Sequence, residues 1–223
     1  NGTLMNLPPL PDAHAIADHV KAQYGRDTEV IAYGAEVINP PSDRLTELDL
    51  RPGEYHLIVA RLEPENHVLE AVHGYTRSQE TKPLIVVGSA PYSDWYIEKV
   101  KAAADQRTRF VGAIYDQELL DQLYAHAATY THGHSVGGTN PSLLRAMGAS
   151  APVLAFDCEF NREVTGNMAL YWSDAQEYTA LLETDNFNSM GAQLQERVAS
   201  NYQWDSITDQ YETLIHKLAG DAQ

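Results

Sequence analysis

The residues in this chain best suited to chemistry form a glycine-rich turn that leads straight into a helix. The turn and helix start read Gly137, Gly138, Thr139, Asn140, Pro141 and Ser142. Glycines let the backbone approach a ligand closely, and proline is typical of a first helical position. Unpaired amides and about half a unit of positive charge at a helix N-terminus favour a phosphate guest. The alternative is an ordinary helix capped by Asn140 or Thr139.

The elements that must position this turn alternate between strand-like and helix-like patterns. Strands are expected at residues 56–60, 84–87, 109–114, 128–133, 152–156 and 169–172, with helices from about Glu65, Ser93 and Asp116 and after Pro141. The series predicts an α/β protein with a Rossmann-like, doubly wound parallel sheet. Ligands of such sheets bind beyond the carboxyl ends of the strands, so the turns that follow the strands should form the site.

The ends of the chain have their own patterns. Three prolines among residues 1–12 predict an irregular leader, followed by a helix at 14–24 and a short strand at 29–33. The pair Pro40–Pro41 marks a boundary, so we expect a leader, helix and strand in residues 1–40 and one Rossmann-like domain in 41–223. The last 37 residues look helical, and Trp204 and Tyr211 share a helical face expected to pack in the core or between domains.

Composition narrows the classes of partner. The net charge of −16 argues against a nucleic-acid or anionic-lipid surface as the main partner. No apolar run reaches the roughly 18 residues of a membrane span. The single cysteine, Cys158, rules out an internal disulfide framework and fits a cytoplasmic protein, in which it would be a buried, inert thiol.

An ordered set of motifs resembles a known family. The motifs are VARLEPEN at 59–66, VVGS at 86–89, RFVG at 109–112, GGTNPSLLRAMGASAPVLAF at 137–156, NREV at 161–164 and YQWDSITDQYETL at 202–214. They occur in the order seen in the C-terminal, donor-binding half of GT-B glycosyltransferases. The chain is similar, over residues 13–218, to retaining family-4-like enzymes of bacterial capsule and O-antigen assembly, particularly rhamnosyltransferases. The resemblance implies a nucleotide-sugar donor site.

The resemblance also implies roles for single residues. Arg61 would contact the donor diphosphate, unless it is a surface arginine paired with Glu63 or Glu65. The turn at Gly88 would line the donor site. The loop from Gly112 would hold the nucleobase, with Ile114 or Tyr115 packing on the base, although Ile114 could equally be core and Tyr115 a helix-start residue.

The second half of the motif set points to the sugar and phosphates. Asn161 and Glu163 would face the donor sugar and diphosphate, with a charged helix start as the alternative for Glu163. His132 and His134 alternate along a strand and could in principle ligate a metal, but no third ligand is evident, so neither metal nor cofactor is expected. A hydrogen bond to a donor phosphate or sugar is the preferred role of His134, against a satisfied half-buried histidine.

Three positions depart from the family pattern. Many relatives carry a lysine where this chain has Glu65, Asn66 and His67. By spacing, Gly137 and Arg145 stand where relatives place two glutamates, of which the second holds the ribose hydroxyls. Arginine cannot accept a hydrogen bond, so the change suits a deoxyribose donor such as dTDP-rhamnose, or a degenerate site. Arg145 could equally be an ion-paired helix residue or a phosphate ligand.

These observations lead to one expected function and two alternatives. We expect the donor-binding part of a hexosyltransferase-type enzyme that uses a dTDP- or UDP-linked sugar, with rhamnose as the first candidate, and a glycan acceptor held by an N-terminal domain. Without that domain the chain should be inactive, and no catalytic residue is assigned. A scaffolding module with a degenerate site is the main alternative. A nicotinamide or flavin domain is disfavoured, because VARLEPEN stands where G-x-G-x-x-G would be.

Overall fold

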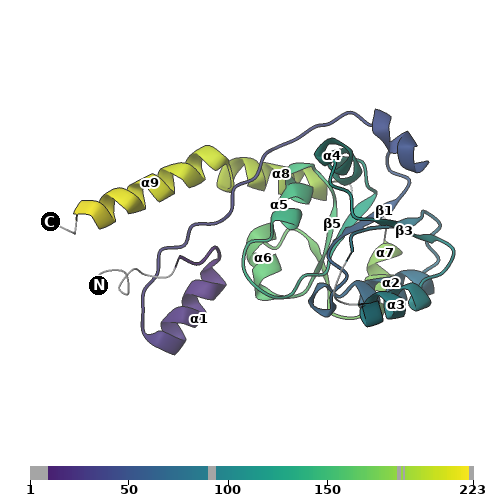
Figure 1. Cartoon of the computed structure of the whole chain (residues 1–223), viewed down its shortest axis with the longest axis horizontal. Helices are drawn as coiled ribbons and strands as arrows, with labels where there is room; N and C mark the ends of the chain where they lie inside the picture. Colours follow the sequence, from purple (N-terminus) through teal and green to yellow (C-terminus); the bar gives the residue numbers. More distant parts are fainter. Residues whose placement is uncertain (1–9, 90–93, 185–186, 188, 221–223) are drawn as a thin grey trace.

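The computed structural model describes residues 10–89, 94–184, 187 and 189–220, and its centre is a parallel sheet (Figure 1). The strands are β1 (His56–Val59), β2 (Leu84–Val87), β3 (Thr108–Gly112), β4 (Thr129–His132), β5 (Val153–Phe156) and β6 (Leu170–Trp172). Their order is β3-β2-β1-β4-β5-β6, and every neighbouring pair is parallel. This is the expected doubly wound, Rossmann-like sheet, and each predicted strand from residue 56 onward is confirmed within two residues.

Helices cover both faces of the sheet (Figure 1). The helices are α1 (His14–Tyr24), α2 (Val68–Arg77), α3 (Asp94–Ala103), α4 (Gln117–Ala125), α5 (Pro141–Gly148), α6 (Glu159–Thr165), α7 (Ala175–Leu182), α8 (Met190–Asn201) and α9 (Trp204–Gly220), with 3-10 turns η2 (Asp43–Leu48) and η3 (Pro64–Asn66). Helices α2, α3 and α7 share one apolar cluster, and η2, α4, α5 and α8 share the other. Successive strand residues point to opposite faces, so Leu57 joins the second cluster and Ile58 the first.

Two sequence-based assignments need correction in their details. The helix expected from about Glu65 begins as η3, and α2 starts only at Val68, because His67 has a left-handed backbone with φ of 46°. Helix α4 starts at Gln117, where the Asp116 carboxylate accepts the Leu119 N–H at 3.1 Å and caps the helix. Ser93 and residues 1–9 of the leader lie outside the described residues.

The strand predicted at residues 29–33 is wrong. The segment is irregular, and its Ile31 N–H donates to the Pro11 carbonyl at 3.1 Å instead of to a neighbouring strand. Ile31 packs against Ile207 and Leu214 of α9 in a small separate cluster. A strand pattern needs a sheet edge to pair with, and none of the described strands is next to this segment.

The core role predicted for Trp204 and Tyr211 of α9 is wrong, whereas their packing against another domain stays a prediction. Trp204 and Tyr211 are 48% and 41% exposed, so neither is a core residue. The buried residues of this helix are Ile207 and Leu214, which are also seven residues apart. Trp204 lies against Gly34, where a Cβ would come within 2.3 Å of the indole ring. Helix α9 therefore holds the chain segment that precedes the sheet, and Figure 1 shows it extending away from the α/β body.

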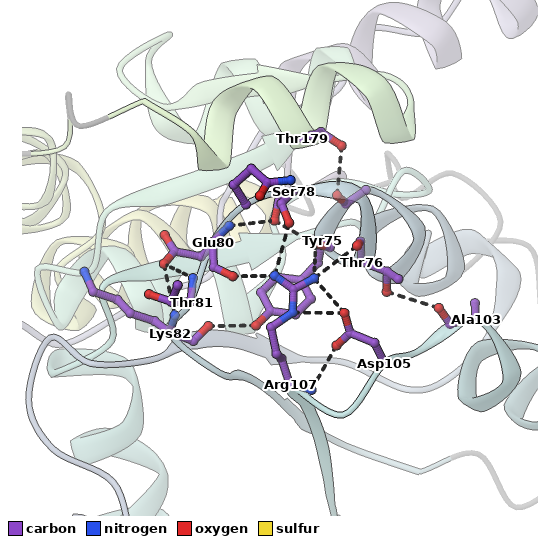
Figure 2. Close-up of polar contacts among 12 residues, drawn as sticks. Tyr75, Thr76, Ser78, Glu80, Thr81, Lys82, Ala103, Asp105, Arg107 and Thr179 are labelled. Carbon is purple, nitrogen blue, oxygen red and sulfur yellow. Dashed lines mark hydrogen bonds and ion pairs between the residues drawn. The ribbon is translucent and has the colours of Figure 1, made fainter.

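A polar cluster around Arg107 fixes the amino end of the sheet (Figure 2). The Arg107 guanidinium donates to the carbonyls of Thr76 at 3.0 Å and Ser78 at 3.1 Å, and also to the carbonyl of Glu80. It lies over the Tyr75 ring and is held by Asp105 at 2.9 Å. Arg107 thus satisfies carbonyls at the C-terminus of α2 that have no partner within the helix.

Glu80 stands in the same cluster, and its charge is stabilised by several donors. Its Oε2 lies 3.2 Å from His56 Nε2, and its Oε1 accepts the N–H groups of Lys82 at 3.0 Å and Thr81 at 2.7 Å. The His56 side chain first, and then these two amides, lower the pKa of Glu80 from 4.5 to about 2.

Glu80→Gln should therefore reduce stability in a pH-dependent way. Because the folded-state pKa lies below 4.5, the stabilisation is fully present above that pH and is lost as pH falls toward about 2. We expect a loss on the order of 2 kcal/mol at neutral pH, measured by urea unfolding at several pH values, and a smaller loss below pH about 4. Glu212→Gln, at an exposed position on α9, is the control. A loss that is equal at pH 7 and pH 3 would contradict the assignment.

Candidate functional site

The site is set by the place where the winding of the sheet reverses. From β1 the chain proceeds outward to β2 and β3, and from β4 it proceeds to β5 and β6 on the other side. The loops after β1 and β4 therefore leave in opposite directions and open a crevice at the carboxyl edge. A pocket lies there, lined by Val59, Ala60, Arg61, Asn66, His132, Gly133, His134, Asn140 and Ser142.

Hydrogen bonds join the two loops beneath this crevice. The Asn66 amide donates to the Arg61 carbonyl at 2.8 Å, and its oxygen lies 2.7 Å from His134 Nδ1. His67 Nδ1 lies 2.8 Å from the Gly133 carbonyl. A Cβ on Gly133 would come within 2.0 Å of the Asn66 carbonyl, so the two loops approach as closely as glycine permits. Asn66 and His67 therefore hold the two loops together at this point.

A second pocket adjoins the first and continues toward β2 and β3. Both pockets are lined by Val59, Ala60, Arg61 and Ser142, and the second adds Gly88, Ile114 and Tyr115 among others. Gly88 has φ of 149°, and a Cβ there would meet the Ala60 carbonyl at 1.8 Å. Gly88 accordingly lets β1 and β2 stay close at the point where both enter the site.

The two predicted base contacts differ in burial. Ile114 is partly buried against the core cluster and also lines the second pocket, so its contact with a nucleobase stays a prediction. Tyr115 is 93% exposed at the pocket mouth. Gly112 precedes them with φ of 75° and accepts the Gly88 N–H at 2.9 Å through its carbonyl. The turn thus joins the loops after β2 and β3.

Arg61 lines both pockets, and in this structure it is ion-paired. Its guanidinium lies 3.0 Å from Glu63 and 4.0 Å from Glu65, with the side chain 66% exposed. These are the surface pairs foreseen as the alternative. Exposed pairs of this kind contribute little free energy, so they leave the guanidinium free to exchange partners for a phosphate.

The glycine-rich turn forms a capped helix start at the crevice. The Asn140 side chain accepts the Ser142 N–H at 2.9 Å, so Asn140 is the cap of α5. Gly137 has φ of 93° and open space around it. The backbone of Gly138 lies against the Asp12 carboxylate, where a Cβ would come within 1.9 Å, and the Thr139 hydroxyl donates to the Asp12 carbonyl. The N-terminal segment therefore covers half of this turn.

The two histidines differ in environment. His134 is half-buried, burial lowers its pKa, and its carbonyl accepts the Asn161 amide at 2.9 Å. His132 is 3% exposed, and its Nε2 has no hydrogen-bond partner among the described residues. Their ring centroids are 6.4 Å apart. Within the described part of the chain, no group of three or more His, Cys, Asp or Glu side chains is placed to hold a metal ion.

Arg145 belongs to an ion-pair cluster and is not among the residues lining the crevice pocket. It donates to Asp121 of α4 at 2.7 Å and lies 3.5 Å from Glu36. Asp121 raises the pKa of Arg145 further above its ordinary value. Its ion-paired reading fits this geometry, and the position offers no hydrogen-bond acceptor.

Asn161 and Glu163 make structural contacts on the sugar side of the predicted site. Asn161 is buried and donates to the carbonyls of His134 and Phe156, each at 2.9 Å. Glu163 accepts the N–H groups of His14 at 2.7 Å and Ala15 at 3.1 Å, and so caps α1. A third pocket, lined in part by Asp12, Thr139 and Glu163, lies beside these contacts.

Several residues of the site were not foreseen from sequence. Asn66 joins the two loops, Asp12 covers the glycine-rich turn, and Tyr124 and Tyr130 lie beneath His132 and Ser142. Only Asn66, inside VARLEPEN, carried a signal that could have found it. The others come from distant elements whose contacts no local pattern encodes.

Several solved structures share this fold. HepE from Anabaena in complex with UDP is 17% identical, with a TM-score of 0.81 over 93% of this chain and 63% of its own. Sucrose-phosphate synthase from Thermosynechococcus elongatus is 20% identical, with a TM-score of 0.82 over 95% of this chain and 58% of its own. The pneumococcal O-GlcNAc transferase GtfA in complex with UDP and GlcNAc is 14% identical, with a TM-score of 0.72 over 94% of this chain and 45% of its own.

These neighbours and the sheet define the fold as a Rossmann-like domain of the GT-B type. The chain spans less than two thirds of the length of each of the three. The family model described as glycosyl transferases group 1 matches residues 54–184, more than half of the chain. The chain therefore belongs to that family. No curated protein matches its sequence. Among the described residues, no helix is both long and apolar enough to cross a bilayer.

Removal of the Glu163 carboxylate should release α1. No residue of this described helix is buried, so the bonds from Glu163 to its first amides are a main anchor. Glu163→Ala should speed amide hydrogen exchange throughout α1 about fivefold to tenfold, while α5 keeps its protection. Glu159→Ala, at an exposed position on α6, the helix that carries Glu163, is the control. Equal exchange in both variants would show that α1 is held by other contacts.

Proposed function

We propose that this chain is the nucleotide-sugar donor-binding part of a glycosyltransferase that transfers a sugar to a glycan acceptor. The observation that carries the proposal is the pair of connected pockets at the β1/β4 reversal, with the α5 N-terminus and Arg61 at their junction. Backbone dipoles and one exchangeable guanidinium suit a diphosphate there. The pocket at Gly88 and Ile114 suits the nucleobase, and the side at Thr139 and Glu163 suits the sugar.

The mechanism assigned to the intact enzyme uses these groups to stabilise a leaving nucleoside diphosphate. As the glycosidic bond to the donor breaks, negative charge gathers on the diphosphate. Helix α5 and Arg61 would stabilise the diphosphate more strongly in the transition state, where this charge develops, than in the ground state. The acceptor hydroxyl would come from a glycan held by an N-terminal domain of the intact enzyme, and we expect no transfer without that domain.

The identity of the donor rests on the base pocket and the ribose position. HepE and GtfA were solved with UDP, which favours a uridine diphosphate donor by analogy. Arg145 cannot accept a hydrogen bond from ribose hydroxyls. This favours a nucleotide sugar that does not need such a bond, such as a dTDP-sugar. We retain dTDP-rhamnose as the sugar donor to examine first, and cell-surface polysaccharide synthesis in the cytoplasm as the setting.

A non-catalytic scaffolding module is the second candidate function. It is favoured by the ion pairs of Arg61 with Glu63 and Glu65, and by the use of Glu163 as a helix cap. Both contacts pair predicted donor ligands with protein groups in this structure. The two candidates differ in one observable, the binding of a nucleoside diphosphate.

Calorimetric titration with dTDP, UDP, GDP and ADP tests the proposal directly. We expect one nucleotide to bind selectively, and Arg61→Ala to weaken its binding about tenfold or more, because charge-assisted hydrogen bonds to phosphate are lost. Arg51→Ala, at another exposed arginine, should leave binding unchanged. Absence of heat with all four nucleotides on folded protein would reject the donor-domain proposal and favour the scaffolding module.

The ribose position makes a second, independent prediction. If no carboxylate holds the ribose hydroxyls, UDP and 2′-deoxy-UDP should bind with affinities within about threefold of each other. A buried hydrogen bond to a charged acceptor would instead favour UDP by about tenfold or more. Competition between the two nucleotides in the same titration measures the ratio directly. A strong preference for UDP would show that another acceptor, such as Asp121, has replaced the missing glutamate.

A further inference from the structure

The crevice pocket contains one buried polar atom that lacks a partner. His132 lines the pocket, is 3% exposed, and has no hydrogen bond at Nε2 among the described residues. A buried polar group left unpaired costs free energy, and such groups in native proteins call for an explanation. Its position beside Ser142 and Arg61, where the diphosphate is proposed to lie, suggests that a ligand supplies the missing partner.

The other edge of the His132 ring is fixed from below. His132 Nδ1 lies 3.2 Å from the Tyr130 hydroxyl, and both residues are on β4, pointing to the same face of the sheet. Tyr130 is 0% exposed and packs edge-on against Tyr124 of α4, with ring centroids 5.2 Å apart. The imidazole therefore cannot turn over without breaking this contact, and Nε2 is the only ring nitrogen it can offer to the pocket.

A chain of hydroxyl groups connects His132 to the other wall of the pocket. Tyr124 lies between Tyr130 and Ser142, because the side chains of both act on its pKa, and Ser142 lines the same pocket as His132. The order is Ser142, Tyr124, Tyr130, His132, with one proton on each link. Because each hydroxyl has a single proton, the chain runs in one of two directions. It presents a proton to the pocket either at His132 Nε2 or at the Ser142 hydroxyl.

An anion in the pocket selects between these directions. Burial, and then His134, lower the pKa of His132 to about 3, so the ring is neutral and carries one proton at neutral pH. If that proton were on Nδ1, the fixed lone pair of Nε2 would face the anion and repel it. The Ser142 hydroxyl can rotate, so it tolerates the opposite direction. The arrangement with Nε2–H toward the anion is therefore favoured.

We propose that His132 donates an Nε2–H hydrogen bond to the diphosphate of the bound nucleotide, and that Tyr130 sets this tautomer by donating its hydroxyl proton to Nδ1. The inference rests on the proposed function and adds a binding residue and a positioning residue to that site. Tyr130 touches no ligand and acts only through His132. Tyr124 and Ser142 complete the line of protons behind it.

Nitrogen NMR of the histidine-labelled 223-residue chain tests the tautomer without any substitution. The chemical shift distinguishes a protonated ring nitrogen from an unprotonated one. We expect His132 to be protonated at Nε2 and unprotonated at Nδ1, and the Nε2 signal to move when UDP, dTDP or inorganic pyrophosphate is added. A His132 ring that is unprotonated at Nε2 in the presence of the bound anion would overturn the proposal.

Binding measurements on variants test the energetic role. His132→Phe should weaken binding of the selected nucleoside diphosphate about tenfold to a hundredfold, while its nucleoside, which lacks phosphate, binds as before. His132→Gln, whose amide reaches the place of Nε2, should recover most of the loss. His216→Phe on α9 is the control at an exposed histidine. Unchanged diphosphate binding by folded His132→Phe would overturn the proposal, and if that variant does not fold, the NMR result decides.

Tyr130→Phe examines the positioning residue. It removes only the hydroxyl, so we expect a mixture of the two His132 tautomers in the NMR spectrum and a binding loss of about threefold to tenfold. An unaltered tautomer would show that Tyr130 does not set it.

The failure of this inference can be told apart from failure of the proposed function. If the wild-type chain binds none of the nucleotides but pyrophosphate moves the His132 Nε2 signal, the donor-domain proposal fails, and His132 donates to a diphosphate that does not belong to these nucleotides. If a nucleotide binds and the signal of Nε2 does not respond, only the inference fails. If neither nucleotide nor pyrophosphate affects the protein, both are wrong.

Discussion

The parallel pairing of β1 with β4, at the point where the winding of the sheet reverses, is the constraint on which the rest of the structure depends. His56 pairs with Thr129 and Ile58 with Thr131, so both strands end at the same level. Their loops must then diverge, and no helix can fill the gap between them. Arg61, His134 and the start of α5 meet at this gap because the sheet order leaves them no other place.

An open gap at a sheet edge would lose its shape without bonds that hold the loops at a fixed separation. Asn66 supplies them by bonding to Arg61 on one side and His134 on the other, and His67 adds a bond to Gly133. The close approach of the Asn66 carbonyl to Gly133 leaves no space for a side chain. The crevice is thus held at a fixed width where we propose that phosphate oxygens bind. It is adaptable at Arg61, whose ion pairs are exposed.

The sequence predicted the sheet well because parallel strands buried on both faces leave a strong local pattern. The runs at 84–87 and 152–156 are apolar throughout, and the structure buries both faces of each. The same reasoning failed at residues 29–33, where an apolar pattern has no strand to pair with and serves instead to pack against α9. On α9, aromatic spacing identified Trp204 and Tyr211, whereas the aliphatic residues Ile207 and Leu214 are the ones buried in this structure.

For the site, the sequence could indicate which turns meet but not what each side chain does there. The order of the motifs placed the glycine-rich turn, Arg61 and His134 at one edge of the sheet. In the structure Arg61 and His134 line the crevice pocket, and the glycines of the turn lie beside it. The partners of Arg145 and Glu163 were beyond sequence reasoning, because Asp121, Glu36 and the first amides of α1 come from remote elements. A local motif specifies a backbone shape, whereas an ion pair or a cap across elements depends on how the whole domain folds.

The charge of the protein explains why neutral donors matter in this crevice. With a net charge of −16, and with Glu63 and Glu65 beside the arginine of the site, a bound diphosphate meets repulsion that one guanidinium cannot fully offset. Oriented neutral groups avoid this difficulty, since amides at the α5 N-terminus attract an anion without needing a counter-charge of their own. A neutral imidazole held by a buried tyrosine belongs to the same class of donor. Burial keeps it neutral, and the same burial strengthens the hydrogen bond that we propose its Nε2–H donates to the diphosphate.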